Sequence, residues 1–218
     1  FDSLMNMGST DIHLQHIDST GKPAAKWNIN GIPVVNSDIR ESYSRIAFSD
    51  DKKAVYVSYM RGEIGKAKLY LKKFNASDGK QDKDWLDNGI IISPGPVYFN
   101  VKNDNFLFCD KKNNAIIIWN EPRYTVNGET FFQQVSPLGL PQLSGSGLCI
   151  AGKEYESGTG YLEAVRNEEG NFIIAFNNYN NNYNINALKI APNGNIIWKN
   201  LDVTTDGKSA HPKPISNG

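Results

Sequence analysis

A sequence unit recurs about every 55 to 60 residues along this chain of 218 residues. The two clearest copies each read as a strand, a glycine turn and then Trp-x-x-Asn-Gly, and two weaker copies follow. The turn glycines of the four copies are Gly21, Gly79, Gly139 and Gly194. A fixed period of this size is typical of repeat architectures in which each unit packs on its neighbours. The period therefore constrains the fold strongly, and it says little about any ligand or reaction.

Each unit contains four segments with the character of β-strands. In the second unit, Arg45–Ser49 is joined by the polar turn Asp50–Lys53 to an apolar strand that ends at Tyr59. A third segment, Lys68–Lys72, alternates as a half-buried strand does, and Gly89–Ile92 supplies the fourth. Short polar turns between such segments are typical of β-hairpins. Four antiparallel strands per unit is the pattern of a β-propeller blade.

We therefore expect an all-β fold, a β-propeller of four-stranded antiparallel blades. No stretch shows helical periodicity, which excludes helical solenoids, and a two-sheet sandwich is the main alternative. The expected units are a partial blade at 1–36, blades at about 37–95, 96–152 and 153–205, and a partial blade at 206–218. With these boundaries the chain starts and stops inside blades. We therefore expect the chain to be a single propeller segment, an excerpt from a larger ring.

Composition excludes several classes of partner. Lysine plus arginine equals aspartate plus glutamate, at 23 each, so no net field favours a polyanion and nucleic acid is not an expected partner. No apolar run approaches the ~18 to 20 residues that a transmembrane helix needs. The two cysteines, Cys109 and Cys149, lie in apolar strand-like segments. We expect buried free thiols, with a disulfide as the alternative.

The residues that recur most regularly in the repeat are expected to have a structural role. A Trp at the same place in successive blades fills the space between adjacent sheets, and stacking on a sugar is the alternative for these rings. The expected structural repeat residues are Gly21, Trp27, Gly31, Gly79, Trp85, Gly89, Gly139, Gly147, Gly194 and Trp198.

An Asn- and Tyr-rich run at 177–184 is the most unusual local composition of the chain. Asn tolerates left-handed backbone geometry, and Tyr combined with Asn suits polar recognition. We predict a ligand-binding loop here, and an ordinary solvated loop is the alternative. The candidate residues are Asn178, Tyr179, Asn181 and Tyr183.

The sequence offers no catalytic constellation. His13 and His16 lie three apart on one predicted strand, so they face opposite sides of the sheet and cannot hold one metal ion. Glu121 with Arg123 is expected to brace a loop, and the acidic pair at 168–169 looks like a solvated turn. We predict no catalytic residue, no metal and no cofactor.

The segment 11–21, followed by Trp27-x-x-Asn30-Gly31, resembles a repeat of large secreted bacterial proteins exported by the type IX secretion route. The likeness is at the level of fold and covers essentially the whole chain. It departs from the pattern at Leu143, which stands in place of the third unit's Trp. The resemblance implies a β-propeller at an extracellular or cell-surface location.

We expect a non-catalytic secreted or cell-surface propeller that serves as a binding or structural scaffold within a larger protein, with a protein or glycan partner. One alternative is a glycan-active hydrolase or lyase with its site at the central channel. Another is an accessory or cargo subunit of a secretion or surface assembly. Fold alone does not choose among these functions.

Overall fold

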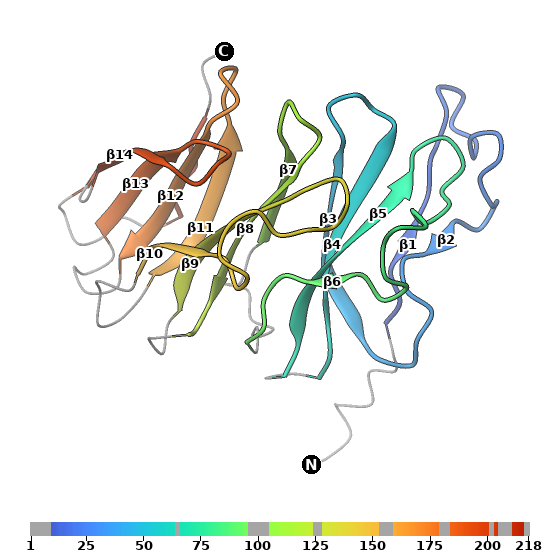
Figure 1. Cartoon of the computed structure of the whole chain (residues 1–218), viewed down its shortest axis with the longest axis horizontal. Helices are drawn as coiled ribbons and strands as arrows, with labels where there is room; N and C mark the ends of the chain where they lie inside the picture. The colour runs from blue at the N-terminus through green and yellow to red at the C-terminus, as the bar shows by residue number, and fades with distance from the viewer. Residues whose placement is uncertain are drawn as a thin grey trace.

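The computed structural model describes residues 10–63, 66–95, 105–123, 128–152, 159–178, 184–200, 203–204 and 211–215. All of their regular elements are β-strands (Figure 1). The strands are β1 (His13–Leu14), β2 (Ile32–Pro33), β3 (Glu41–Phe48), β4 (Ala54–Arg61), β5 (Lys68–Asn75), β6 (Ile90–Ile91), β7 (Asn105–Cys109), β8 (Ala115–Glu121), β9 (Glu129–Val135), β10 (Leu148–Ala151), β11 (Thr159–Arg166), β12 (Phe172–Asn178), β13 (Asn184–Ile190) and β14 (Ile196–Asn200).

Twelve of these strands form three four-stranded antiparallel sheets, in which neighbours in sequence are neighbours in space. We call β3–β6 the first blade, β7–β10 the middle blade, β11–β14 the last blade, and the pair β1–β2 the N-terminal sheet. Figure 1 shows them side by side, from the N-terminal sheet at one side of the molecule to the last blade at the other. The expectation of an all-β fold with four-stranded propeller blades is confirmed.

The first strand of each blade lies innermost. β7 contacts both β3 and β11, which belong to the blades on either side of it. At the ends of β3 and β11, the guanidinium of Arg166 lies 3.7 Å from the carboxylate of Asp50. The blades therefore converge on their first strands, as the blades of a propeller do.

The hydrophobic core is divided into three clusters, each between two neighbouring sheets. Between the first and middle blades, for example, Leu71 packs in one cluster with Trp119 and Phe131. Every residue of β8 is buried because sheets cover both of its faces. This explains why Ala115–Trp119 is continuously apolar in the sequence: a strand covered on both sides has no solvent face.

Short hairpin turns at 49–53, 110–114 and 167–171 join the first two strands of each blade, as the sequence predicts. In the middle blade, Asp110 Oδ1 accepts hydrogen bonds from the backbone N–H groups of Lys112 (2.8 Å) and Asn114 (2.9 Å). Ser49 and Asn167 cap the other two turns in the same way. We call this the turn end of the blades, and the end at which β3, β7 and β11 begin the loop end.

The fourth strands differ from the expected pattern. β2 and β6 have only two residues each, and Trp27 and Trp85 lie buried in the loops before them. Trp198, in contrast, lies inside β14, where it pairs with Lys189 and is 41% exposed. The last unit has three residues between Gly194 and Trp198, where the first two units have five between glycine and tryptophan. After the Gly194 turn the chain therefore pairs directly with β13 as the hairpin strand β14.

Both cysteines are free thiols. Cys109 is buried as expected, whereas Cys149 is half-buried. Burial raises the pKa of the Cys109 thiol to about 11, so this group stays protonated at neutral pH.

Candidate functional site

Buried polar side chains gather at the loop end, and one of them, Glu121 in the middle blade, is bonded to three other side chains. Its carboxylate accepts a hydrogen bond from Trp119 Nε1 (2.8 Å) and another from Ser93 Oγ. The guanidinium of Arg123 pairs with the same carboxylate, with Nε at 2.6 Å, and lies 3.9 Å from the centre of the Phe131 ring. All these partners hold the carboxylate in place, which fits a structural brace.

Glu129 lies directly across from Glu121 on the neighbouring strand, and both are buried. Glu129 Oε2 accepts a hydrogen bond from the backbone N–H of Arg123 at 2.9 Å. The two carboxylates therefore share one arginine residue, through its side chain and its backbone. This arrangement offsets the cost of burying two acids.

Glu41 is the buried acid at the loop end of the first blade. Ser37 Oγ donates a hydrogen bond to its carboxylate at 2.9 Å, and Arg61 Nε lies 3.8 Å away. Burial raises the pKa of Glu41, and the negative charge of Asp11 raises it further. A buried acid with a raised pKa beside a second acid is an arrangement that can donate a proton.

The predicted Asn/Tyr ligand loop falls largely outside the described residues, which do not include Tyr179, Asn181 and Tyr183. Asn178 is described: it ends β12, pairs with Asn184 and is 3% exposed. Its side chain is therefore buried rather than presented at the surface.

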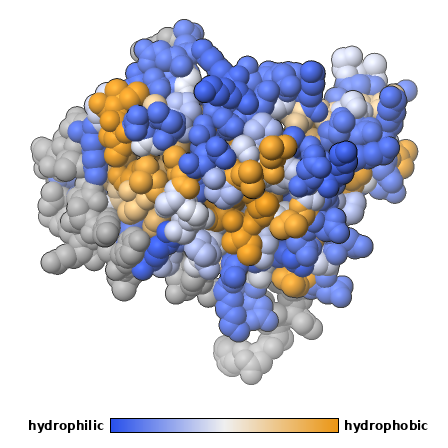
Figure 2. All heavy atoms as spheres, viewed as in Figure 1, coloured by the Kyte–Doolittle hydropathy of each residue, from blue (hydrophilic) through white to orange (hydrophobic). Residues whose placement is uncertain are grey.

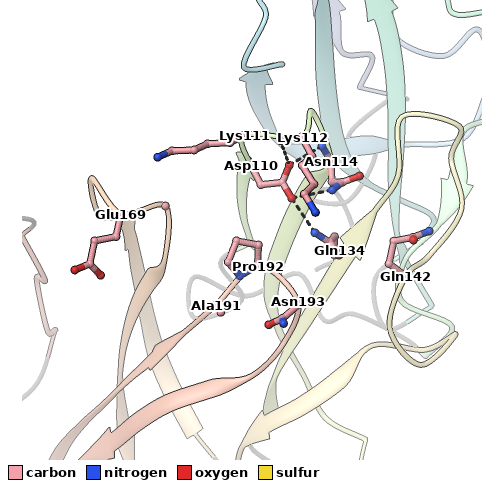
Figure 3. A pocket seen from close by; sticks show the side chains of 11 residues that line it. Asp110, Lys111, Lys112, Asn114, Gln134, Gln142, Glu169, Ala191, Pro192 and Asn193 are labelled. Carbon is pink, nitrogen blue, oxygen red and sulfur yellow. Dashed lines mark hydrogen bonds between the residues drawn. The ribbon is translucent and has the colours of Figure 1, made fainter.

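The turn end contains a cavity of about 540 Å³ between the middle and last blades (Figure 3). Its walls come from the β7–β8 turn, from β9 and the loop after it, and from two turns of the last blade. The lining residues are Asp110, Lys111, Lys112, Asn114, Gln134, Gln142, Glu169, Gly170, Ala191, Pro192 and Asn193. The volume lies within the ~300 to 1,000 Å³ typical of small-molecule sites. We call this cavity the inter-blade pocket.

The two acids of the inter-blade pocket are bound to neighbouring side chains. Asp110 Oδ2 accepts hydrogen bonds from Asn114 Nδ2 and Gln134 Nε2, each at 2.8 Å, and Figure 3 shows these groups converging on one wall. Glu169, on the opposite wall, pairs with Lys189 Nζ at 2.6 Å. That bond, with two from Asn side chains, lowers the pKa of Glu169. Both oxygens of Asp110 are bonded, whereas the Glu169 bonds all fall on Oε2.

The groups that remain are cationic or neutral. Lys111 and Lys112 are exposed, and neither forms an ion pair within the described part of the chain. The amide of Gln142, in the loop after β9, and that of Asn193, in a turn of the last blade, add donors and acceptors to the lining. The inter-blade pocket therefore offers two free ammonium groups and several amides, without an aromatic ring among its lining residues.

A cavity of about 280 Å³ lies at the corresponding place between the first and middle blades. Here direct hydrogen bonds cross the gap: Lys73 Nζ and Trp85 Nε1 both donate to the carbonyl oxygen of Pro137 at 3.0 Å. Asn113 Oδ1 also accepts a hydrogen bond from the backbone N–H of Asp51 at 3.0 Å. These bridges fill the space that stays open in the inter-blade pocket.

Sequence reasoning predicted the 110–114 turn and missed the pocket that it lines. The signal present was a polar turn, Asp110–Asn114, together with Gln134 near the end of the third strand. That signal did not show that a turn of the next blade, around Pro192, closes the other side.

Comparison with known proteins shows a likeness in fold only. No known family matches the sequence, and no characterised protein is similar to it in sequence. A crystal structure of a thermostable family-43 glycoside hydrolase aligns over 93% of this chain and 73% of its own, with a TM-score of 0.46 and 14% identity. A mutant levansucrase of B. megaterium aligns over 90% of this chain and 63% of its own, with a TM-score of 0.40 and 13% identity. Likeness at this level leaves the activity of the present chain open.

In the part of the chain that the structure describes, no group of three or more His, Cys, Asp or Glu side chains could hold a metal ion. The same residues include no helix of the length and apolarity needed to cross a bilayer.

Proposed function

We propose that this chain is a non-catalytic binding module that takes an acidic saccharide in the inter-blade pocket. The observation that carries the proposal is the state of the pocket's charges: both acids have internal partners, whereas Lys111 and Lys112 have no ion pair among the described residues. A carboxylate on a ligand would supply the missing counter-charge.

The neutral groups of the pocket explain the preference for a saccharide over a simple anion. Amides donate and accept hydrogen bonds, as the hydroxyl groups of a sugar do, and Asn114, Gln142 and Asn193 bring such amides to the walls. Since the described lining residues include no aromatic ring, the proposed recognition rests on hydrogen bonds and charge rather than on stacking. We therefore expect a hydrated site whose affinity for the ligand is modest and falls as the salt concentration rises.

Isothermal titration of the chain with glucuronic acid and with glucose tests this proposal. We expect glucuronic acid to bind at millimolar concentration and glucose to bind at least ~10-fold more weakly, because only the acid pairs with the two lysines. The double variant K111S/K112S should remove that difference. Equal binding of the two sugars, or no binding of either, contradicts the proposal.

The control is a double variant that removes the same charge elsewhere. Lys22 and Lys83 are exposed and lie outside the pocket, so K22S/K83S should bind glucuronic acid as the unmodified chain does. If the control loses affinity as well, the effect comes from net charge and the pocket is not the site. Raising the salt concentration should weaken binding to the unmodified chain.

We propose that this propeller is a scaffold or recognition module within a secreted or cell-surface protein. The support is the resemblance of the 11–31 repeat to those of large proteins exported by the type IX secretion route. Detection of the native protein in the culture supernatant or at the cell surface of its source organism tests this location. Retention in the cell interior contradicts it.

A glycan-active enzyme is the second candidate, and the raised pKa of Glu41 beside Asp11 is the observation that favours it. In that case Glu41 would act as the proton donor at the loop end. Screening the chain and its E41Q variant for release of reducing sugar from a panel of glycans tests the idea. Hydrolysis that is lost in E41Q supports the enzyme, and absence of hydrolysis by the unmodified chain removes it.

A further inference from the structure

Lys111 and Lys112 are the two central residues of one tight turn, and their ammonium groups point in different directions. The Asp110 carbonyl oxygen accepts a hydrogen bond from the backbone N–H of Asn113 at 3.1 Å, which closes the turn. Asp110 Oδ1 accepts another from the backbone N–H of Lys112 at 2.8 Å. In Figure 3 the Lys111 side chain extends toward the turn that carries Glu169, and the Lys112 side chain does not extend toward it. The two ammonium groups are therefore separate positions for an anion.

The Lys111 end of the inter-blade pocket is built from two blades. A Cβ built on Gly170 would lie 3.8 Å from Lys111 Cε and 3.8 Å from Arg166 Nη2. Lys111 thus reaches across from the middle blade to the last blade, to a place where a second cation lies. Asp50 Oδ1 lies 3.7 Å from Arg166 Nη1 on the other side of that guanidinium. This end of the pocket is therefore cationic and has a defined position in the fold.

The remainder of the lining extends away from the Lys111 end. Figure 3 shows the lining residues spread from Glu169 at one side to Gln142 at the other. The cavity has a volume of about 540 Å³, and cavities of ~300 to 1,000 Å³ hold drug-sized molecules, which are larger than one sugar ring. Figure 2 shows mainly hydrophilic residues along the upper edge of the molecule, where the turn end lies. The pocket therefore suits a polar ligand longer than a single sugar.

We propose that the inter-blade pocket takes two consecutive acidic residues of an oligosaccharide, with one carboxylate at Lys111 and the next at Lys112. This inference rests on the function proposed above, because it assigns a longer ligand to the same pocket. Each carboxylate forms a charge-assisted hydrogen bond with one ammonium group. Since both carboxylates belong to one molecule, the second bond forms at a high effective concentration, and the diacid binds more tightly than a monoacid.

Isothermal titration with three matched sugars tests the proposal. The probes are glucuronic acid, the β-1,4-linked disaccharide of two glucuronic acids, and cellobiouronic acid, which has the same linkage and a single carboxylate. We expect the diacid to bind at least ~5-fold more tightly than cellobiouronic acid, because only the diacid pairs with both lysines. The two disaccharides have the same length, so the comparison separates the second charge from the second ring.

The single variants K111S and K112S each remove one ammonium group and keep the backbone bonds of the turn. Either variant should bind the diacid no more tightly than cellobiouronic acid. Binding of glucuronic acid should fall only about 2-fold in each, because the other lysine still offers a position for one carboxylate. K83S is the control: Lys83 is exposed and lies outside the pocket, so this variant should keep the preference for the diacid.

The outcomes separate this proposal from the one on which it rests. If the diacid binds no more tightly than cellobiouronic acid, the two-carboxylate site is wrong, and the proposed function stands provided that glucuronic acid still binds better than glucose. Complete loss of glucuronic acid binding in one single variant also overturns the site, because one lysine would then hold the only carboxylate. No binding of any probe contradicts both proposals. Thermal unfolding of each variant shows that it is folded before affinities are compared.

Discussion

Trp85 and Trp27 occupy equivalent positions of the repeat in different surroundings. Trp85 lies at the junction between the first and middle blades, and Trp27 lies at the junction between the N-terminal sheet and the first blade. Trp85 packs in the larger apolar cluster, and its Nε1 donates to the Pro137 carbonyl oxygen at 3.0 Å. Trp27 packs against fewer buried side chains, and its buried Nε1 has no hydrogen-bond partner among the described residues. We therefore expect the tryptophan at this position of the repeat to contribute different amounts of stability at the two junctions.

The two junctions also differ in buried charge. At the N-terminal junction, Lys72 is buried and its Nζ donates to the Val34 carbonyl oxygen at 2.6 Å. Burial lowers the pKa of this lysine, and Glu41 nearby has a raised pKa for the same reason. Both shifts mean that the charged forms are disfavoured there. A repeat can therefore keep its geometry while the chemistry that holds each junction changes.

The largest difference should appear when each tryptophan is cut back to alanine. W85A removes a buried ring and its hydrogen bond, and we expect a loss of ~3 to 5 kcal/mol in the free energy of unfolding. W27A should cost less, because fewer buried neighbours surround Trp27. Urea unfolding followed by circular dichroism measures both. Equal losses would mean that the two junctions are energetically alike.

A smaller and more specific difference should follow from phenylalanine substitutions. W85F keeps an aromatic ring and leaves the Pro137 carbonyl without one donor, so we expect a loss of about 0.5 to 1.5 kcal/mol from the hydrogen bond, beyond the effect of the smaller ring. W27F removes a buried N–H that finds no partner in the described part of the chain, and should cost less than W85F or stabilise the chain. The same urea unfolding compares them, and a larger loss for W27F would contradict this account of Trp27 Nε1.

The smallest expected effect is a change in pH dependence from E41Q. A carboxyl whose pKa is raised by folding binds its proton more tightly in the folded state, so its contribution to stability is present below the ordinary value of 4.5 and is lost as the pH rises through the folded pKa. Unfolding free energies measured upward from pH 4.5 should therefore fall more in the unmodified chain than in E41Q. W85F, at the other junction, should keep the pH slope of the unmodified chain.

Local sequence patterns were sufficient to predict the blades and insufficient to predict the inter-blade pocket. The polar turns at 110–114 and 167–171, and the two-sided apolar run that became β8, are read directly from residue order, because hairpins and strands are set by contacts between near neighbours. The inter-blade pocket joins Asp110 to Pro192, whose spacing in the sequence carries no periodic signal. The prediction of a ligand loop around Asn178 rested on composition, and that side chain is buried in β12.

The sequence by itself determined that this protein consists of four-stranded antiparallel blades with a glycine in the turn after the third strand segment of each unit, because strand periodicity and turn chemistry are local properties. Only the tertiary structure decided that Lys111 and Lys112 form no ion pair with another described residue, and that Trp198 lies partly exposed in β14 while Trp85 is buried. Those outcomes depend on how neighbouring blades meet, and packing between blades joins residues far apart in the chain.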